Sequence, residues 1–131
     1  MILYAWDSNA ILSTSFKSKS SADQLGDITF LYECLHKKGQ MTSFHIMDNE
    51  APRFVTNYLD THNIKHQLVF PHVHRCNAAE RAISTWKDHF IARLCTTDPQ
   101  SPMHLWDRIL PQCDYTLNVM KASRLHPTLS T

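Results

Sequence analysis

The stretch PHVHRCNAAERAISTWKDHF, residues 71–90, decides how this chain is interpreted, because an irregular polar segment gives way within it to a helical pattern. Apolar residues recur at spacings of three and four and predict a helix over residues 77–94. The predicted apolar stripe consists of Ala79, Ile83, Trp86, Phe90 and Leu94. Glu80, Ser84 and Lys87 are spaced at i, i+4 and i+7, so they share another face. A carboxylate and a lysine on one face suit a hard metal ion together with a phosphate backbone.

Outward from this helix, short apolar runs typical of strands alternate with amphipathic runs typical of helices. Strands are predicted over residues 2–6, 10–16, 42–47 and 65–70, with Ser8 and Asn9 in the turn between the first two. Helices are predicted over residues 21–38, 51–62, 77–94 and 103–121; Gly39 ends the first and Pro111 kinks the last. The order β-β-α-β-α-β-α-α predicts an α/β fold that begins with an antiparallel hairpin.

Length and composition are those of one intracellular globular domain. The chain has 131 residues, of which 43% are hydrophobic and 19% charged, and this is enough to build a core. A net charge of +1 neither demands nor forbids a nucleic-acid partner. The four cysteines form no C-x-x-C pair, so reduced thiols are expected at Cys34, Cys76, Cys95 and Cys113. No apolar run is long enough to span a membrane, and the two glycines cannot build a phosphate-cradling loop.

Asp48 is the second acidic candidate, because it directly follows the predicted strand TSFHIM, residues 42–47. In open α/β sheets, ligands bind beyond the carboxyl ends of strands, which is where Asp48 is expected. A structural alternative exists: Asp48 or Asn49 can cap the next helix, and Glu50 would then face the positive end of the helix dipole. Glu80 has the same structural alternative at the start of its own helix.

Three segments together resemble one protein family. They are MDNEAP (47–52), QLVFPHVHRCNAAERAISTWKDHFIARLCTTDP (67–99) and LWDRILPQCDYTLNVMKASRLHP (105–127). Over essentially the whole chain, these residues resemble the integrase core of copia-type retrotransposons, and NAAERAI (77–83) with HLWDRILPQ (104–112) is the specific part. The resemblance implies a ribonuclease H-like fold and a single partial integrase core over residues 1–131.

The family's chemistry uses two Asp and one Glu to hold two Mg²⁺ or Mn²⁺ ions, which cut and join DNA. The resemblance implies that Asp48 is the second Asp and Glu80 the Glu, each a catalytic residue and a metal ligand. It also implies DNA as a partner (retroelement ends and target DNA), the option of a homo-oligomer, and a nuclear location. Contacts to DNA are expected from Arg75, Arg81, Ser84 and Lys87. For each basic residue, a solvated surface charge is the alternative.

His72, His74 and Cys76 form another group of candidate metal ligands. Their alternation places all three on one side of an extended segment, as a zinc or copper site could use. A fourth ligand at a suitable spacing is missing, however, and structural zinc sites use four. A loop near DNA is the favoured interpretation, with Arg93 as a further basic candidate nearby.

Asp7 also ends an apolar run, but topology argues against it as the family's first Asp. A ribonuclease H-like sheet carries that Asp on its first strand and continues with two antiparallel strands before the first helix. The residues between Asp7 and helix 21–38 leave room for one strand and its turn, not two. Residues 2–6 are therefore expected to be the family's second strand. With the first strand absent, residues 2–6 and 43–47 should lie about 10 Å apart, without direct pairing.

The chain is accordingly expected to be an integrase-core fragment that is inactive alone, because the Asp that bridges both metal ions is missing. The alternative is a non-catalytic module, derived from an integrase, that binds DNA or a protein partner. In either case the carboxylates of Asp48 and Glu80 are expected about 4–8 Å apart in one cleft. Lys87 should line this cleft, and Trp86 should point into the core.

Overall fold

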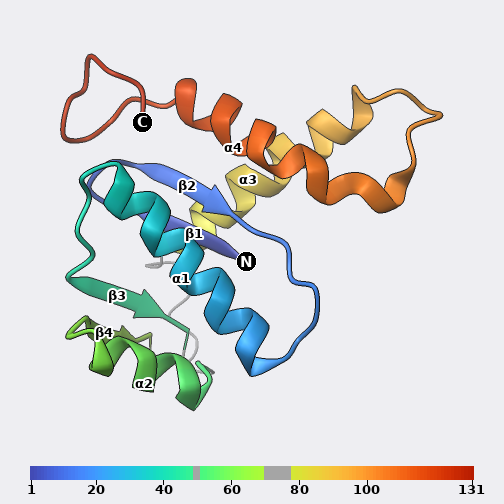
Figure 1. Cartoon of the computed structure of the whole chain (residues 1–131). Helices are drawn as coiled ribbons and strands as arrows, with labels where there is room; N and C mark the ends of the chain where they lie inside the picture. The colour runs from blue at the N-terminus through green and yellow to red at the C-terminus, as the bar shows by residue number, and fades with distance from the viewer. Residues whose placement is uncertain (49–50, 70–77) are drawn as a thin grey trace. The chain divides into compact units, whose positions relative to one another are not determined.

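The computed structural model describes residues 1–48, 51–69 and 78–131 and has a mixed α/β architecture (Figure 1). Its strands are β1 (Ile2–Ala5), β2 (Ala10–Ser13), β3 (Phe44–Met47) and β4 (Lys65–Leu68). Its helices are α1 (Ser21–Lys37), α2 (Arg53–Thr61), α3 (Ala78–Cys95) and α4 (Leu110–Val119), and a 3₁₀ helix, η2 (Met103–Ile109), precedes α4. The predicted order of strands and helices is confirmed. Among the described residues, no helix is long and apolar enough to cross a membrane.

The last predicted helix differs in detail from the structure. Residues 103–121 were expected to form one helix kinked at Pro111, whereas they divide into η2 and the shorter α4. Leu105 has non-helical angles (φ −95°, ψ 17°), so the break lies upstream of the proline. Pro111 sits in the first turn of α4, where its missing N–H has no helical acceptor to lose.

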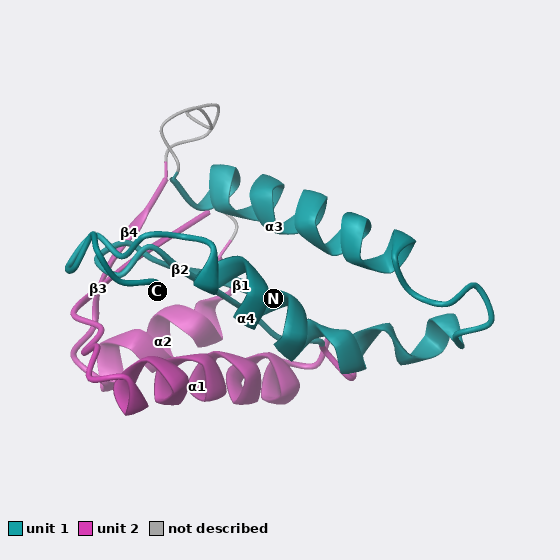
Figure 2. Cartoon of the chain, turned by 90° about the horizontal axis from the view of Figure 1, so that it is seen from above, with its two compact units in different colours: residues 1–15, 78–131 teal, residues 16–77 magenta. Residues whose placement is uncertain are grey.

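The chain divides into two compact units, coloured separately in Figure 2. Unit 1 comprises residues 1–15 and 78–131, so it joins two distant segments of the chain. Unit 2 is the continuous segment of residues 16–77. Each unit contains one small sheet: β1 and β2 pair antiparallel in unit 1, and β3 and β4 pair parallel in unit 2.

The described strands form two separate two-stranded sheets. The expected lack of pairing between residues 2–6 and residues 43–47 concerns different units and stays a prediction. The expected spacing between these two segments stays a prediction. In the hairpin, Asn9 adopts a positive φ of 67°, a conformation that asparagine tolerates better than most residues. The predicted turn at Ser8 and Asn9 is therefore confirmed.

The core of unit 1 brings together β2, α3 and α4. Ile11, Ala82 and Leu117 form its buried cluster, and the half-buried Tyr4 and Trp86 pack against it. The prediction that Trp86 points inward is confirmed. The residue of α3 that is fully buried is Ala82, which was not part of the predicted stripe. A small side chain at this position lets the helix approach the hairpin closely.

Side chains of α4 satisfy the backbone of β2. The Asn118 Oδ1 accepts a hydrogen bond from the Ile11 N–H (2.9 Å), and the Asn118 Nδ2 donates to the Ile11 carbonyl (2.7 Å). One turn earlier on α4, Asp114 accepts from the Ser13 N–H (2.5 Å) and from the Ser13 hydroxyl (2.8 Å). An unpaired strand edge is a liability for aggregation. This i, i+4 pair of polar residues covers the β2 edge as a neighbouring strand would.

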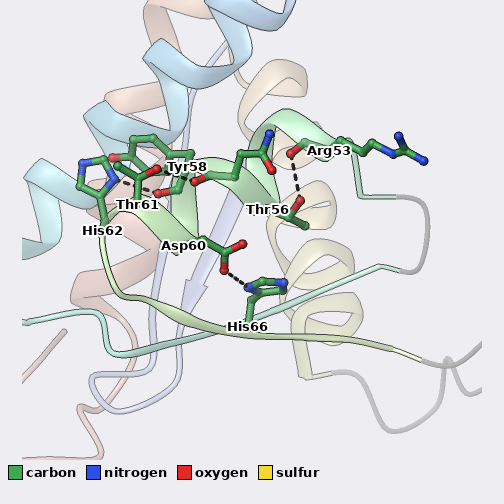
Figure 3. A network of polar contacts seen from close by, with 8 residues as sticks. Arg53, Thr56, Tyr58, Asp60, Thr61, His62 and His66 are labelled. Carbon is green, nitrogen blue, oxygen red and sulfur yellow. Dashed lines mark hydrogen bonds and ion pairs between the residues drawn. The ribbon is translucent and has the colours of Figure 1, made fainter.

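Unit 2 packs α1 and α2 around the parallel pair of strands. Its buried apolar residues come from both helices and from the start of β4: Ile28, Leu31, Tyr32, Leu35, Val55, Leu59 and Ile64. Figure 3 shows polar contacts around α2, including the ion pair between His66 of β4 and Asp60 of α2 (3.4 Å). Thr56 donates to the Arg53 carbonyl within the same helix (2.9 Å). The contact between His66 and Asp60 joins α2 to the adjacent strand, whereas the hydrogen bond of Thr56 lies within the helix.

Candidate functional site

Asp48 lies immediately after β3 and is exposed, at the position that the sequence predicted. Its carbonyl accepts a hydrogen bond from the Ala51 N–H (3.1 Å). The N-cap of α2 is Pro52, in an extended conformation. The alternative in which Asp48 is the N-cap of α2 is therefore wrong, and Asn49 lies outside the described residues.

Glu80 lies in the first turn of α3 and is exposed. Ser84 and Lys87 are exposed further along the same helix, while Trp86 is turned toward the core of unit 1. The helical register inferred from the sequence is confirmed by these four side chains. A carboxylate in the first turn also suits the positive end of the helix dipole, so the structural role of Glu80 is compatible with a functional one.

The two candidate acids belong to different units, since Asp48 lies in unit 2 and Glu80 in unit 1. Their expected convergence in one cleft, together with the place of Lys87 in it, stays a prediction. Both are exposed carboxylates, and hard oxygen ligands are what Mg²⁺ and Mn²⁺ prefer. Within the described ranges, no group of three or more His, Cys, Asp or Glu residues could hold a metal ion. Two carboxylates alone would leave much of the coordination sphere of an ion to water.

Several candidates cannot be placed. Arg75, His72, His74, Cys76 and Glu50 lie outside the described residues. Asp7 is described: it lies in the turn between β1 and β2 and is exposed.

Arg81 has surroundings that the sequence did not predict. It is the neighbour of Glu80 in the sequence, but it lines a pocket of about 190 Å³ in unit 1 together with Thr85, Lys121 and Arg124. Its expected contact to DNA stays a prediction. Sequence reasoning missed the contribution of Lys121 and Arg124. A signal was present in the pair of basic residues three positions apart just after α4.

Comparison of the chain with protein-family models, with curated proteins and with solved structures found no match.

Proposed function

We propose that this chain is a copia-type integrase core with a ribonuclease H-like fold that binds DNA. The observation that carries the proposal is the surface of α3. Glu80, Ser84 and Lys87 are all exposed on this helix, while Trp86 anchors its opposite side in the core. An integrase core needs a helix that presents a carboxylate and DNA-binding side chains together, and the sequence motif around Glu80 is the most specific part of the resemblance.

The order of elements supports the finer fold proposal. The chain begins with an antiparallel hairpin, which is followed by a helix and then by two parallel strands that a second helix connects. Elements follow in the same order after the first strand of a ribonuclease H-like sheet.

Asp48 and Glu80 have complementary roles in this proposal. Their carboxylates would hold a Mg²⁺ or Mn²⁺ ion, which, when bound, stabilises charge on the attacking and leaving oxygens of a phosphodiester. Lys87 would neutralise a phosphate of the DNA backbone, and Ser84 would donate a hydrogen bond to it. Because these two acids would bind one ion weakly, the 131-residue chain is proposed to bind DNA without joining it.

Paramagnetic relaxation by Mn²⁺ tests the site directly. If the two carboxylates share an ion, NMR signals near Asp48 and near Glu80 should broaden together at the same Mn²⁺ concentration. Asp48→Asn should then reduce the broadening near Glu80, and Glu80→Gln should reduce it near Asp48. Asp88→Asn, at an exposed position of α3, is the matched control and should leave both effects intact. If the broadening near one acid stays the same when the other acid is substituted, the two acids do not share an ion.

A strand-transfer assay with Mn²⁺ and retroelement-end DNA tests the proposed lack of joining. No product is expected above the metal-only background, whereas Lys87→Gln should weaken DNA binding several-fold and Lys19→Gln should not. Robust joining that Glu80→Gln abolishes would overturn the inactive assignment. DNA binding that persists without any Mn²⁺ effect at the acids would instead identify a non-catalytic binding module.

A further inference from the structure

Three basic side chains converge on one pocket in unit 1. The pocket has a volume of about 190 Å³, and its polar or aromatic lining residues are Tyr4, Asn9, Arg81, Thr85, Lys121 and Arg124. They come from the hairpin, from the first two turns of α3 and from the segment after α4. Clefts that take drug-sized ligands measure about 300–1,000 Å³, so this pocket suits a small group.

Aromatic contacts hold two of the three cations in place. The guanidinium of Arg124 lies 3.8 Å from the centre of the Trp6 ring and donates a hydrogen bond to the Trp6 carbonyl (3.3 Å). The ammonium of Lys121 lies 5.4 Å from the centre of the Tyr4 ring, and Arg124 lies 5.8 Å from the same centre. Cation–π contacts of this kind orient a charge without neutralising it.

The charges of these cations are not compensated by acids. In the part of the chain that the structure describes, none of Arg81, Lys121 and Arg124 forms an ion pair. Burial and the nearby charge of Arg124 both lower the pKa of Lys121, which is the direction expected where cations are crowded together. A bound anion would relieve this repulsion.

The neutral polar groups of the pocket are already engaged. The Tyr4 hydroxyl donates to Asn9 Oδ1 (3.0 Å), Asn9 Nδ2 donates to the Ala122 carbonyl (3.0 Å), and the Thr85 hydroxyl donates to the Arg81 carbonyl (2.9 Å). Asn9 Nδ2 keeps one N–H, so the donors left for a ligand are mainly cationic. Guanidinium groups bind the oxygens of phosphate in a bidentate manner, and an ammonium adds a point charge.

We propose that this pocket binds a phosphate group, carried either by free phosphate or pyrophosphate or by a nucleic-acid backbone. The inference goes beyond the proposed function, because the pocket uses neither Asp48 nor Glu80. The phosphate site can therefore fail while the metal site stands, and the reverse also holds.

Titration of the intact chain with pyrophosphate and with a single-stranded oligonucleotide, each followed by NMR, tests the proposal. The indole signal of Trp6 reports on the pocket, because Arg124 lies over its ring. We expect this signal to shift, and we expect Lys121→Gln or Arg124→Gln to weaken binding about tenfold each. Arg108→Gln removes the same charge at an exposed position of η2 and should change the affinity less than about twofold.

The two ligands distinguish the sources of phosphate. Saturable pyrophosphate binding that depends on Lys121 and Arg124 identifies a site for free phosphate groups. Oligonucleotide binding with the same dependence, but without pyrophosphate binding, identifies a contact to a nucleic-acid backbone. Equal losses in the pocket variants and in Arg108→Gln, or no shift of the wild-type Trp6 signal with either ligand, would overturn the proposal. The wild-type shift decides the question even if one variant fails to fold.

Discussion

Asp114 connects three elements of unit 1 through one buried carboxylate. From its place on α4 it accepts hydrogen bonds from Ser13 on β2 and from the Trp86 indole on α3 (2.8 Å). Burial raises the pKa of Asp114, although the hydrogen bonds from Trp86 and Ser13 act in the opposite direction. The carboxylate is thus costly to bury and is retained because it satisfies donors from two neighbouring elements.

Asp114→Asn should lower the free energy of unfolding by about 1–3 kcal/mol. An amide has one oxygen where the carboxylate has two. Its NH₂ group would therefore face either the Ser13 N–H or the Ser13 hydroxyl and the Trp86 indole, which are all donors in this structure. Urea unfolding followed by tryptophan fluorescence measures the change. Asp88→Asn makes the same chemical change on an exposed part of α3 and should have an effect of less than about 0.5 kcal/mol. Equal effects at both positions would show that the Asp114 contacts contribute nothing.

At the scale of an element, α1 shows how local sequence defines both ends of a helix. The Ser20 hydroxyl accepts the Asp23 N–H at the start (3.1 Å). At the end, Gly39 adopts a positive φ of 76°, and its N–H donates to the His36 carbonyl (2.9 Å). The next residue, Gln40, donates to the Leu35 carbonyl (3.0 Å), which completes a Schellman motif. The prediction that Gly39 closes this helix is confirmed.

The two glycines of the chain should respond to alanine with opposite signs. Gly39→Ala forces a side chain into the left-handed region and should destabilise unit 2 by about 1 kcal/mol. Gly26→Ala, inside α1, meets nothing within 4 Å and should stabilise the helix by about 0.5–1 kcal/mol. Thermal unfolding followed by circular dichroism measures both. A stabilising Gly39→Ala would contradict the described end of the helix.

The contact between α1 and β3 should make unit 2 sensitive to acid. The Tyr32 hydroxyl lies 2.6 Å from His45 Nδ1, and burial, followed by the charge of His66, lowers the pKa of His45 below its ordinary value of 6.5. Below about pH 6.5, His45 binds a proton more readily in the unfolded chain than in the folded one. The contribution of neutral His45 to the free energy of unfolding is therefore complete above about pH 6.5 and is lost as the pH falls toward the pKa of His45 in the folded state. The free energy of unfolding falls by no more than about 1.4 kcal/mol per pH unit for this one group.

Urea unfolding at about pH 7.5 and about pH 5.5 measures this dependence. The loss of stability on acidification should be smaller in His45→Phe than in the wild-type chain, because the variant has no imidazole at this position to protonate. His104→Phe, which replaces an exposed histidine of η2, should keep the wild-type slope. Identical slopes in all three proteins would show that His45 is not the group responsible.

For the whole molecule, a net charge of +1 provides little long-range attraction to DNA. The proposed binding to DNA therefore depends on local groups of cations, of which the pocket with Arg81, Lys121 and Arg124 is one. If three cations each contact a phosphate of a single strand, log K should fall with log salt with a slope of about −2. Arg124→Gln should make this slope shallower by about 0.7, whereas Arg108→Gln should leave it unchanged. Fluorescence anisotropy of a labelled oligonucleotide measures the slope, and an unchanged slope in Arg124→Gln would rule out its phosphate contact.

The sequence alone determined the features that depend on neighbouring residues. The order of strands and helices, the end of α1 at Gly39 and the inward register of Trp86 all follow from spacing and from backbone preferences that act over a few residues. The exposed face of α3 with Glu80 and Lys87 follows from the same periodicity. These features can be predicted from the sequence, because the interacting groups are close along the chain.

Only the tertiary structure decided which distant side chains meet. Asn118 covers the edge of β2 at Ile11, and Arg124 lies over Trp6, although more than a hundred residues separate the partners in each pair. No local pattern marks these partners, since their positions follow from the packing of α3 and α4 on the hairpin. The physical reason is that periodicity indicates which face of an element is buried, whereas the choice of partner depends on shape and polar complementarity that exist only after the chain has folded.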